Sequence, residues 1–184
     1  MTLRTREGIA FLIAFALCIP AANWLIGNVG TVCVPNGPCL IPVAPGIAAP
    51  SGVLMIGAAL VLRDLVQRRL GLRYTFFAIL AGTALSAAVA PPALVVASAA
   101  AFLISETADL AIYTPLQKRG LVAAVVASSF VGLVVDSLVF LTLAFGSLTY
   151  LWGQVIGKSW MVLAALPLIV LLRRRDERLG LRAA

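Results

Sequence analysis

The sequence of 184 residues has no histidine, few charged residues and three cysteines. Histidine is the commonest general base and metal ligand, so its absence excludes histidine-dependent hydrolases and argues against zinc enzymes. Hydrophobic residues make up 62% of the chain and charged residues 11%, with a mean hydropathy of +1.07. This composition lies far outside that of soluble domains. We therefore expect an integral membrane protein, with no catalytic residue, metal or cofactor.

Long apolar runs separate the few groups of charged residues. A membrane-spanning helix needs about 20 predominantly apolar residues. Six runs approach this length, at residues 8–26, 52–65, 74–90, 93–113, 121–143 and 151–172. They predict an all-α integral membrane protein with six transmembrane helices, forming one domain over residues 1–184.

The basic residues are distributed unevenly between the predicted loops. If the N-terminus is cytoplasmic, twelve of the fourteen Lys and Arg residues lie on that side, and the other two, Arg63 and Lys158, lie within or near spans. This asymmetry follows the positive-inside rule and predicts that both ends are cytoplasmic. The basic tail from Arg173 is interpreted as a contact with anionic membrane lipid rather than with nucleic acid. The alternative for the first run is a cleaved signal peptide.

Proline and glycine are concentrated between residues 28 and 50. We interpret this stretch as an external loop that is neither helix nor strand. Cys33 and Cys39 lie in it, six residues apart. On an oxidising side of the membrane they could form a disulfide, and the alternative is two free thiols.

Six ionisable residues remain inside the predicted spans. They are Arg63, Asp64, Glu106, Asp109, Asp136 and Lys158. Each costs about 2.5–3.5 kcal/mol at the centre of a spanning helix, so each requires a partner, water or a ligand. Four acids and two bases sum to −2 if all are charged, which predicts a shared proton or a cationic ligand. The adjacent Arg63 and Asp64 could instead simply neutralise each other.

Glu106 and Asp109 are three residues apart and therefore share one face of the fourth predicted helix. Phe102 lies one turn before this pair and Tyr113 one turn after it. The acidic and aromatic face is a candidate for binding a polar base or carrying a proton. The alternative is a salt bridge to one of the two basic residues that only fixes helix packing.

Asp136 in the fifth predicted helix follows Gly132 by one turn and precedes Phe140 by one turn. The glycine would leave room for a ligand and the phenylalanine would offer a ring face. The alternative is an aspartate bonded to a neighbouring serine. Gln154 and Lys158 share a face of the last predicted helix, and the alternative for Lys158 is an ammonium group that extends toward the external interface.

Four segments carry these charges at defined spacings. They are RDLVQRRLG at residues 63–71, AFLISETADLAIYTPLQKR at 101–119, SSFVGLVVDSLVFLTLAFG at 128–146 and GQVIGKSW at 153–160. Together they resemble the Putative vitamin uptake transporter family, whose characterised members are bacterial queuosine-precursor transporters. The combination is specific because it ties rare intramembrane charges to their spacing.

The resemblance implies a six-helix protein of the bacterial cytoplasmic (inner) membrane, similar in fold to the substrate-binding subunits of energy-coupling-factor transporters. It implies import of a 7-deazaguanine such as preQ0 or preQ1 for tRNA modification, not an enzymatic activity. A buried carboxylate can accept the paired N–H donors of a guanine-like edge, and aromatic rings can stack on its plane. The predicted substrate-binding residues are Arg63, Phe102, Glu106, Asp109, Tyr113, Asp136, Phe140, Gln154 and Lys158.

Two other functions remain open from the sequence. One is a substrate-binding subunit for another vitamin-like compound that works with a separate ATPase module, since the chain has no G-x-x-x-x-G-K-[ST] loop of its own. The other is an intramembrane enzyme or a scaffold.

Overall fold

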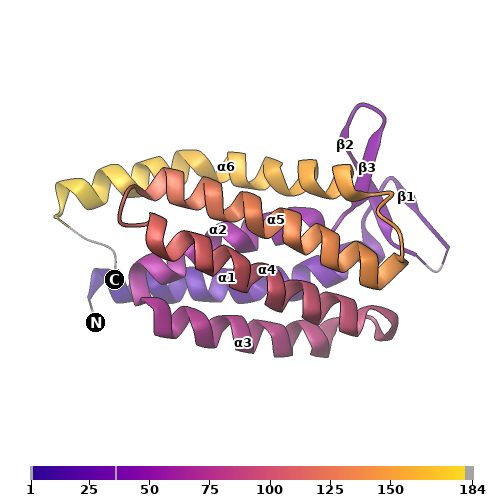
Figure 1. Ribbon diagram of the computed structural model, residues 1–184, viewed down its shortest axis with the longest axis horizontal. Helices are drawn as coiled ribbons and strands as arrows, with labels where there is room; N and C mark the ends of the chain where they lie inside the picture. Colours follow the sequence, from indigo (N-terminus) through magenta and orange to yellow (C-terminus); the bar gives the residue numbers. More distant parts are fainter. Residues whose placement is uncertain (1, 36, 181–184) are drawn as a thin grey trace.

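The structure is a computed structural model that describes residues 2–35 and 37–180. Six long helices run side by side in this part of the chain, and a small sheet lies at one end of them (Figure 1). The helices are α1 (Leu3–Asn28), α2 (Val53–Leu70), α3 (Leu72–Val89), α4 (Val95–Leu116), α5 (Leu121–Phe145) and α6 (Leu151–Arg178). A single 3-10 turn, η1 (Pro92–Leu94), leads into α4.

Each predicted apolar run lies on one of these helices. Five helices are long and apolar enough to span a membrane: α1, α3, α4 with the turn before it, α5 and α6. The 18-residue α2 does not meet the same criterion, because it carries Arg63, Asp64, Arg68 and Arg69. The chain is therefore mostly helical, with five candidate membrane spans.

Helix α2 lies in the interior of the bundle. It packs against each of the other five helices. One apolar core, which includes Leu60, Leu65 and Leu133, joins α2 to α4, α5 and α6. A second core, around Phe15 and Phe102, joins α1, α2, α3 and α4. The outward faces of the helices expose large apolar side chains, as expected where lipid replaces water.

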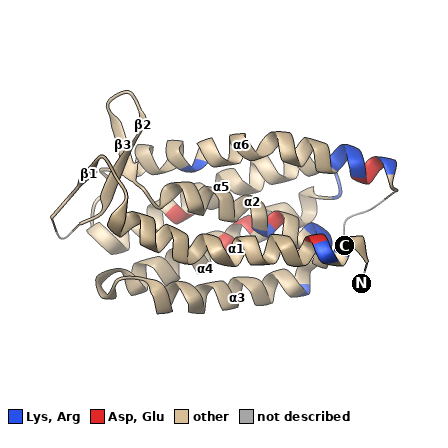
Figure 2. Ribbon diagram, turned by 180° about the vertical axis from the view of Figure 1, so that it is seen from behind, with Lys and Arg blue, Asp and Glu red and all other residues tan. Residues whose placement is uncertain are grey.

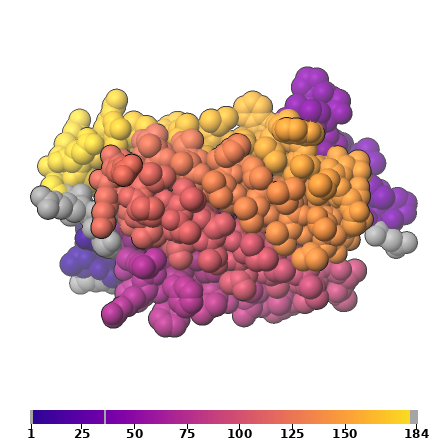
Figure 3. All heavy atoms as spheres, in the orientation of Figure 1, coloured from indigo at the N-terminus to yellow at the C-terminus, as the bar shows by residue number. Residues whose placement is uncertain are grey.

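The segment between α1 and α2 forms a three-stranded antiparallel sheet in the order β1 (Val32–Cys33), β2 (Cys39–Ala44) and β3 (Ile47–Pro50). The prediction that this segment contains no strand was wrong. The space-filling view shows the sheet projecting beyond the helix ends (Figure 3).

The register of the sheet explains why its prolines do not prevent pairing. Pro50 pairs with Leu40 and Pro42 with Ala48, and the Ile41–Ala49 pair lies between them. Alternate pairs of an antiparallel ladder exchange no hydrogen bonds, so residues without an N–H fit there. On its other side Pro42 needs no N–H either, because β1 pairs with β2 only as far as Leu40.

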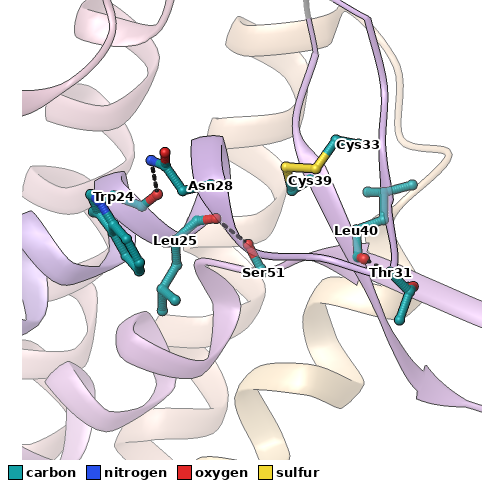
Figure 4. Close-up of a disulfide and its surroundings, with 8 residues drawn as sticks. All are labelled: Trp24, Leu25, Asn28, Thr31, Cys33, Cys39, Leu40 and Ser51. Carbon is teal, nitrogen blue, oxygen red and sulfur yellow. Dashed lines mark hydrogen bonds between the residues drawn. A yellow bond between two sulfur atoms is a disulfide. The ribbon is translucent and has the colours of Figure 1, made fainter.

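The sheet is fastened internally and to the helices. A disulfide joins Cys33 of β1 to Cys39 of β2 (Figure 4). The Ser51 hydroxyl donates to the Leu25 carbonyl at 2.7 Å, at the end of α1 (Figure 4). The Trp160 indole Nε1 donates to the Val43 carbonyl at 2.9 Å, which ties the sheet to α6.

An ion cluster closes the opposite end of the bundle, where Figure 2 shows basic and acidic residues gathered at the end of α6 and close to the start of α1. Arg68 and Arg69 each lie 2.8 Å from the Asp176 carboxylate. Arg69 and Arg175 contact Glu7 at 2.9 and 2.6 Å. These contacts explain why α2 and α6 continue several residues beyond their predicted apolar runs. Part of the basic tail thus bonds to the protein itself.

The Asp176→Asn substitution would leave Arg68 and Arg69, both almost fully buried, without their shared counter-ion. Breaking a buried pair by removing one partner costs about 3–5 kcal/mol, so we expect thermal unfolding in detergent at a clearly lower temperature. Glu177→Gln is the matched control, because its exposed carboxylate pairs loosely with Arg173 at 3.4 Å. Equal stability of the two variants would contradict this assignment.

Candidate functional site

A pocket opens among the helix ends nearest the sheet. Its empty space of about 580 Å³ includes the open region at its mouth. Its lining comes from every helix and from the end of β3. The lining residues are Ile19, Ala22, Asn23, Ile26, Pro50, Gly52, Val53, Ile56, Ser86, Leu94, Ser98, Ala101, Phe102, Asp136, Phe140, Gln154 and Lys158.

Lys158 anchors the polar part of the pocket and is only 1% exposed. Its ammonium donates to Asp136 Oδ2 at 2.6 Å, to Ser137 Oγ at 2.8 Å and to Gln154 Oε1 at 2.5 Å. An ammonium group has three donors, so these three acceptors satisfy it. The lysine therefore does not extend toward the external interface, and its charge cancels that of Asp136.

One oxygen of Asp136 remains available to a ligand. Among the described residues, Oδ1 accepts only a long contact of 3.5 Å from Ser105 Oγ. Phe102 and Phe140 line the same pocket, on α4 and α5. A carboxylate oxygen, a charge-neutral polar triplet and two aromatic rings can together hold a flat heterocycle that presents N–H donors.

A second buried cluster lies deeper in the bundle and does not line the pocket. Arg63 Nη1 lies 2.8 Å from Asp64 Oδ1, Nε lies 3.0 Å from Glu106 Oε2, and Nη2 lies 2.5 Å from Asp109 Oδ1. None of these four side chains is more than 3% exposed. Arg63 therefore pairs with three carboxylates, so the adjacent Arg63 and Asp64 are not a self-contained pair.

Polar side chains of α2, α4 and α5 complete this cluster, and Arg63 Nη1 donates to Gln67 Oε1 at 3.4 Å. Ser128 Oγ donates to Asp64 Oδ2 at 2.8 Å, and Gln67 Nε2 donates to Thr114 Oγ1 at 3.0 Å. The Arg63 guanidinium carbon lies 6.0 Å from the centre of the buried Tyr113 ring, within cation–π range.

Gly132 was expected to leave room for a ligand beside Asp136, and this was wrong. A Cβ placed on Gly132 would lie 2.8 Å from a side-chain carbon of Leu60 and 3.1 Å from Asp109 Oδ2. The missing side chain thus makes room for α2 and for the Arg63 cluster. The carboxylate that lies next to Gly132 is that of Asp109.

The structure divides the nine predicted site residues into two groups. Phe102, Asp136, Phe140, Gln154 and Lys158 line the pocket, whereas Arg63, Glu106, Asp109 and Tyr113 do not. On α4, Phe102, Glu106, Asp109 and Tyr113 do share a buried face. Each further turn of the helix, however, moves a side chain about 5.4 Å along the axis. Only Phe102 is close enough to the sheet end to reach the pocket.

Sequence reasoning missed three polar residues of the pocket wall, Asn23, Ser86 and Ser98. Each comes from a different helix, and none carries a charge that marks it within an apolar run. Asn23 also donates to the Ile19 carbonyl of its own helix, a bond that any membrane helix could contain. No local signal distinguished these residues.

Removing either member of the Lys158–Asp136 pair would leave a buried charge without its partner. We expect Lys158→Met and Asp136→Asn each to lower the free energy of unfolding by about 3–5 kcal/mol, and the double variant to recover most of that loss. Unfolding titrations in mixed micelles measure these values. Ser98→Ala, in the same pocket wall, is the uncharged control. Strictly additive losses would show that the two side chains do not interact.

Residues 88–172 match the family described as Putative vitamin uptake transporter. The matched segment contains α4, α5 and most of α6, and hence Glu106, Asp136 and Lys158, but not Arg63 of α2. No curated protein and no solved structure matches the chain. Together with the five candidate spans, the match supports a multi-pass membrane protein whose pocket-bearing C-terminal part is similar to this transporter family.

Proposed function

We propose that this protein is a bacterial inner-membrane importer of a 7-deazaguanine, a precursor of queuosine in tRNA. The observation that carries the proposal is the pocket in which Asp136, Lys158 and Gln154 lie near two aromatic rings. The similarity of residues 88–172 to a transporter family supports transport as the activity.

We include α2 as a sixth membrane crossing, with both chain ends in the cytoplasm. Arg63 and Asp64 lie inside the bundle and bond to other buried groups, so α2 can cross without exposing their charges to lipid. The sheet carries no charged residue, whereas basic residues gather at the opposite end (Figure 2). By the positive-inside rule the sheet and the pocket mouth then face outward.

The pocket offers hydrogen-bond partners both for the N–H donors and for the carbonyl acceptor of a deazaguanine. Asp136 Oδ1 can accept N–H bonds from the ring and its amino group, and the Gln154 amide nitrogen can donate to the ring carbonyl. Phe102 and Phe140 offer faces for the planar ring. These complementary contacts favour a purine-like ligand over a purely apolar one.

The charge of the pocket favours the uncharged precursor. Lys158 already neutralises Asp136, and the excess negative charge lies around Arg63, outside the pocket lining. A cationic aminomethyl group would therefore enter a site with no net charge and would lose its hydration. On this basis the nitrile preQ0 is a better ligand than the amine preQ1.

Phe140→Ala tests the pocket. Alanine removes one ring face, and base–aromatic stacking is worth about 1–3 kcal/mol, so we expect preQ0 to bind roughly 10-fold or more weakly. Equilibrium binding of labelled preQ0 to purified protein and its uptake into proteoliposomes measure the effect. Phe130→Ala is the matched control, because Phe130 lies on the same helix and is 57% exposed.

Failure of the wild-type protein to bind preQ0 would contradict the proposed substrate. Equal affinity of the Phe140→Ala and wild-type proteins would remove the pocket from the mechanism. Uptake that requires an added ATPase module would instead support a substrate-binding subunit.

A further inference from the structure

We infer that the Arg63 cluster, formed by Arg63, Asp64, Glu106 and Asp109, holds an exchangeable proton that crosses the membrane with the substrate. The presence of the proton follows from the cluster alone. Its movement with the substrate rests on the proposed import function.

The charges of the cluster do not balance without a proton. Three carboxylates surround one guanidinium, which gives −2 if all are ionised, and all four side chains are at most 3% exposed. Such a net charge in an apolar interior is costly, and carboxylates relieve the cost by taking up a proton. A proton neutralises a carboxylate without a coordination shell of its own, so it can relieve the excess charge inside the bundle.

The geometry indicates where the proton can reside. Asp64 and Asp109 contact the two terminal nitrogens of the same guanidinium, so their carboxylates are close neighbours. Like charges held this close disfavour joint ionisation. Among the described residues Asp109 Oδ2 has no hydrogen-bond partner, although its side chain is fully buried. A proton on this carboxyl removes the uncompensated charge.

Among the residues that the structure describes, the surrounding helices supply no further free cation. Lys158 of α6 is bonded to Asp136 of α5, and Arg68 of α2 is bonded to Asp176. The other titratable groups on neighbouring faces are the buried hydroxyl of Tyr113 on α4 and the buried thiol of Cys18 on α1. Both are neutral in their ordinary state. The excess negative charge must therefore be compensated inside the cluster.

A short path connects this cluster to the pocket. Ser105 Oγ lies 3.5 Å from Asp136 Oδ1, and Ser105 directly precedes Glu106 on α4. A ligand that bonds Asp136 changes the charge distribution within a residue or two of Glu106. Substrate binding and protonation can thus influence each other.

Infrared spectroscopy of the purified protein without substrate tests for the proton. At neutral pH the wild-type protein should show the carbonyl band of a protonated carboxyl group, shifted in heavy water. Asp109→Asn should abolish or displace the band. Asp64→Asn and Glu106→Gln test whether one of the other two carboxylates carries the proton. The exposed Glu177→Gln is the control that should leave it unchanged. The absence of the band in the wild-type protein, or its persistence in all three cluster variants, would overturn the inference.

Proteoliposomes loaded at controlled pH test the coupling, with labelled preQ0 as the probe. Wild-type protein should accumulate preQ0 when the outside is more acidic. Asp109→Asn should still exchange preQ0 across the membrane without a gradient, but should accumulate no more with the gradient than without it. Coupling would be overturned if the wild-type protein accumulated preQ0 to the same level with and without the pH gradient. It would also be overturned if Asp109→Asn accumulated preQ0 to the wild-type level. If wild-type protein fails even to exchange preQ0, the proposed function fails, while the infrared test still decides the proton.

Discussion

The structure depends on neutralising charges that the chain places inside an apolar bundle. Two basic side chains, Arg63 and Lys158, contact all four acidic residues of the bundle interior. Buried ions are tolerated only when they are paired and hydrogen-bonded, so these contacts fix which helices must be neighbours. Arg63 joins α2 to α4, and Lys158 joins α6 to α5. Helix α2, which carries Arg63 and Asp64, can occupy the centre of the bundle for this reason.

The helices could be predicted because bilayer thickness imposes a length on apolar runs that is visible in the sequence. Their ends could not be predicted equally well. Helices α2 and α6 continue beyond their apolar runs because Arg68 and Arg69 bond to Asp176, which lies more than a hundred residues away in the chain. The sheet was missed for a related reason. Proline counts against a strand locally, but its effect depends on a pairing register that only the partner strand defines.

The candidate site was half predictable. Helical periodicity correctly places Phe102, Glu106, Asp109 and Tyr113 on one buried face of α4. Periodicity does not indicate how far along that face a pocket extends. It also does not indicate which residue of another helix packs against the part of the face that lies outside the pocket. Arg63 occupies the space beside Glu106 and Asp109, so both carboxylates form ion pairs with this arginine instead of facing a ligand. The alternative of an internal salt bridge, left open by the sequence, describes their contacts in the structure.

Under the proposed function, the division into two clusters separates substrate recognition from charge storage. The pocket presents a neutral pair, so it can select a ligand by shape and hydrogen bonding without attracting every cation. The Arg63 cluster keeps the excess negative charge away from the pocket lining. Ser105 and Glu106 are consecutive residues of α4, and Ser105 faces Asp136 while Glu106 bonds Arg63. Under the proposed coupling, a small rotation of this helix changes the contacts of both clusters together, so that binding in one affects the other mechanically and electrostatically.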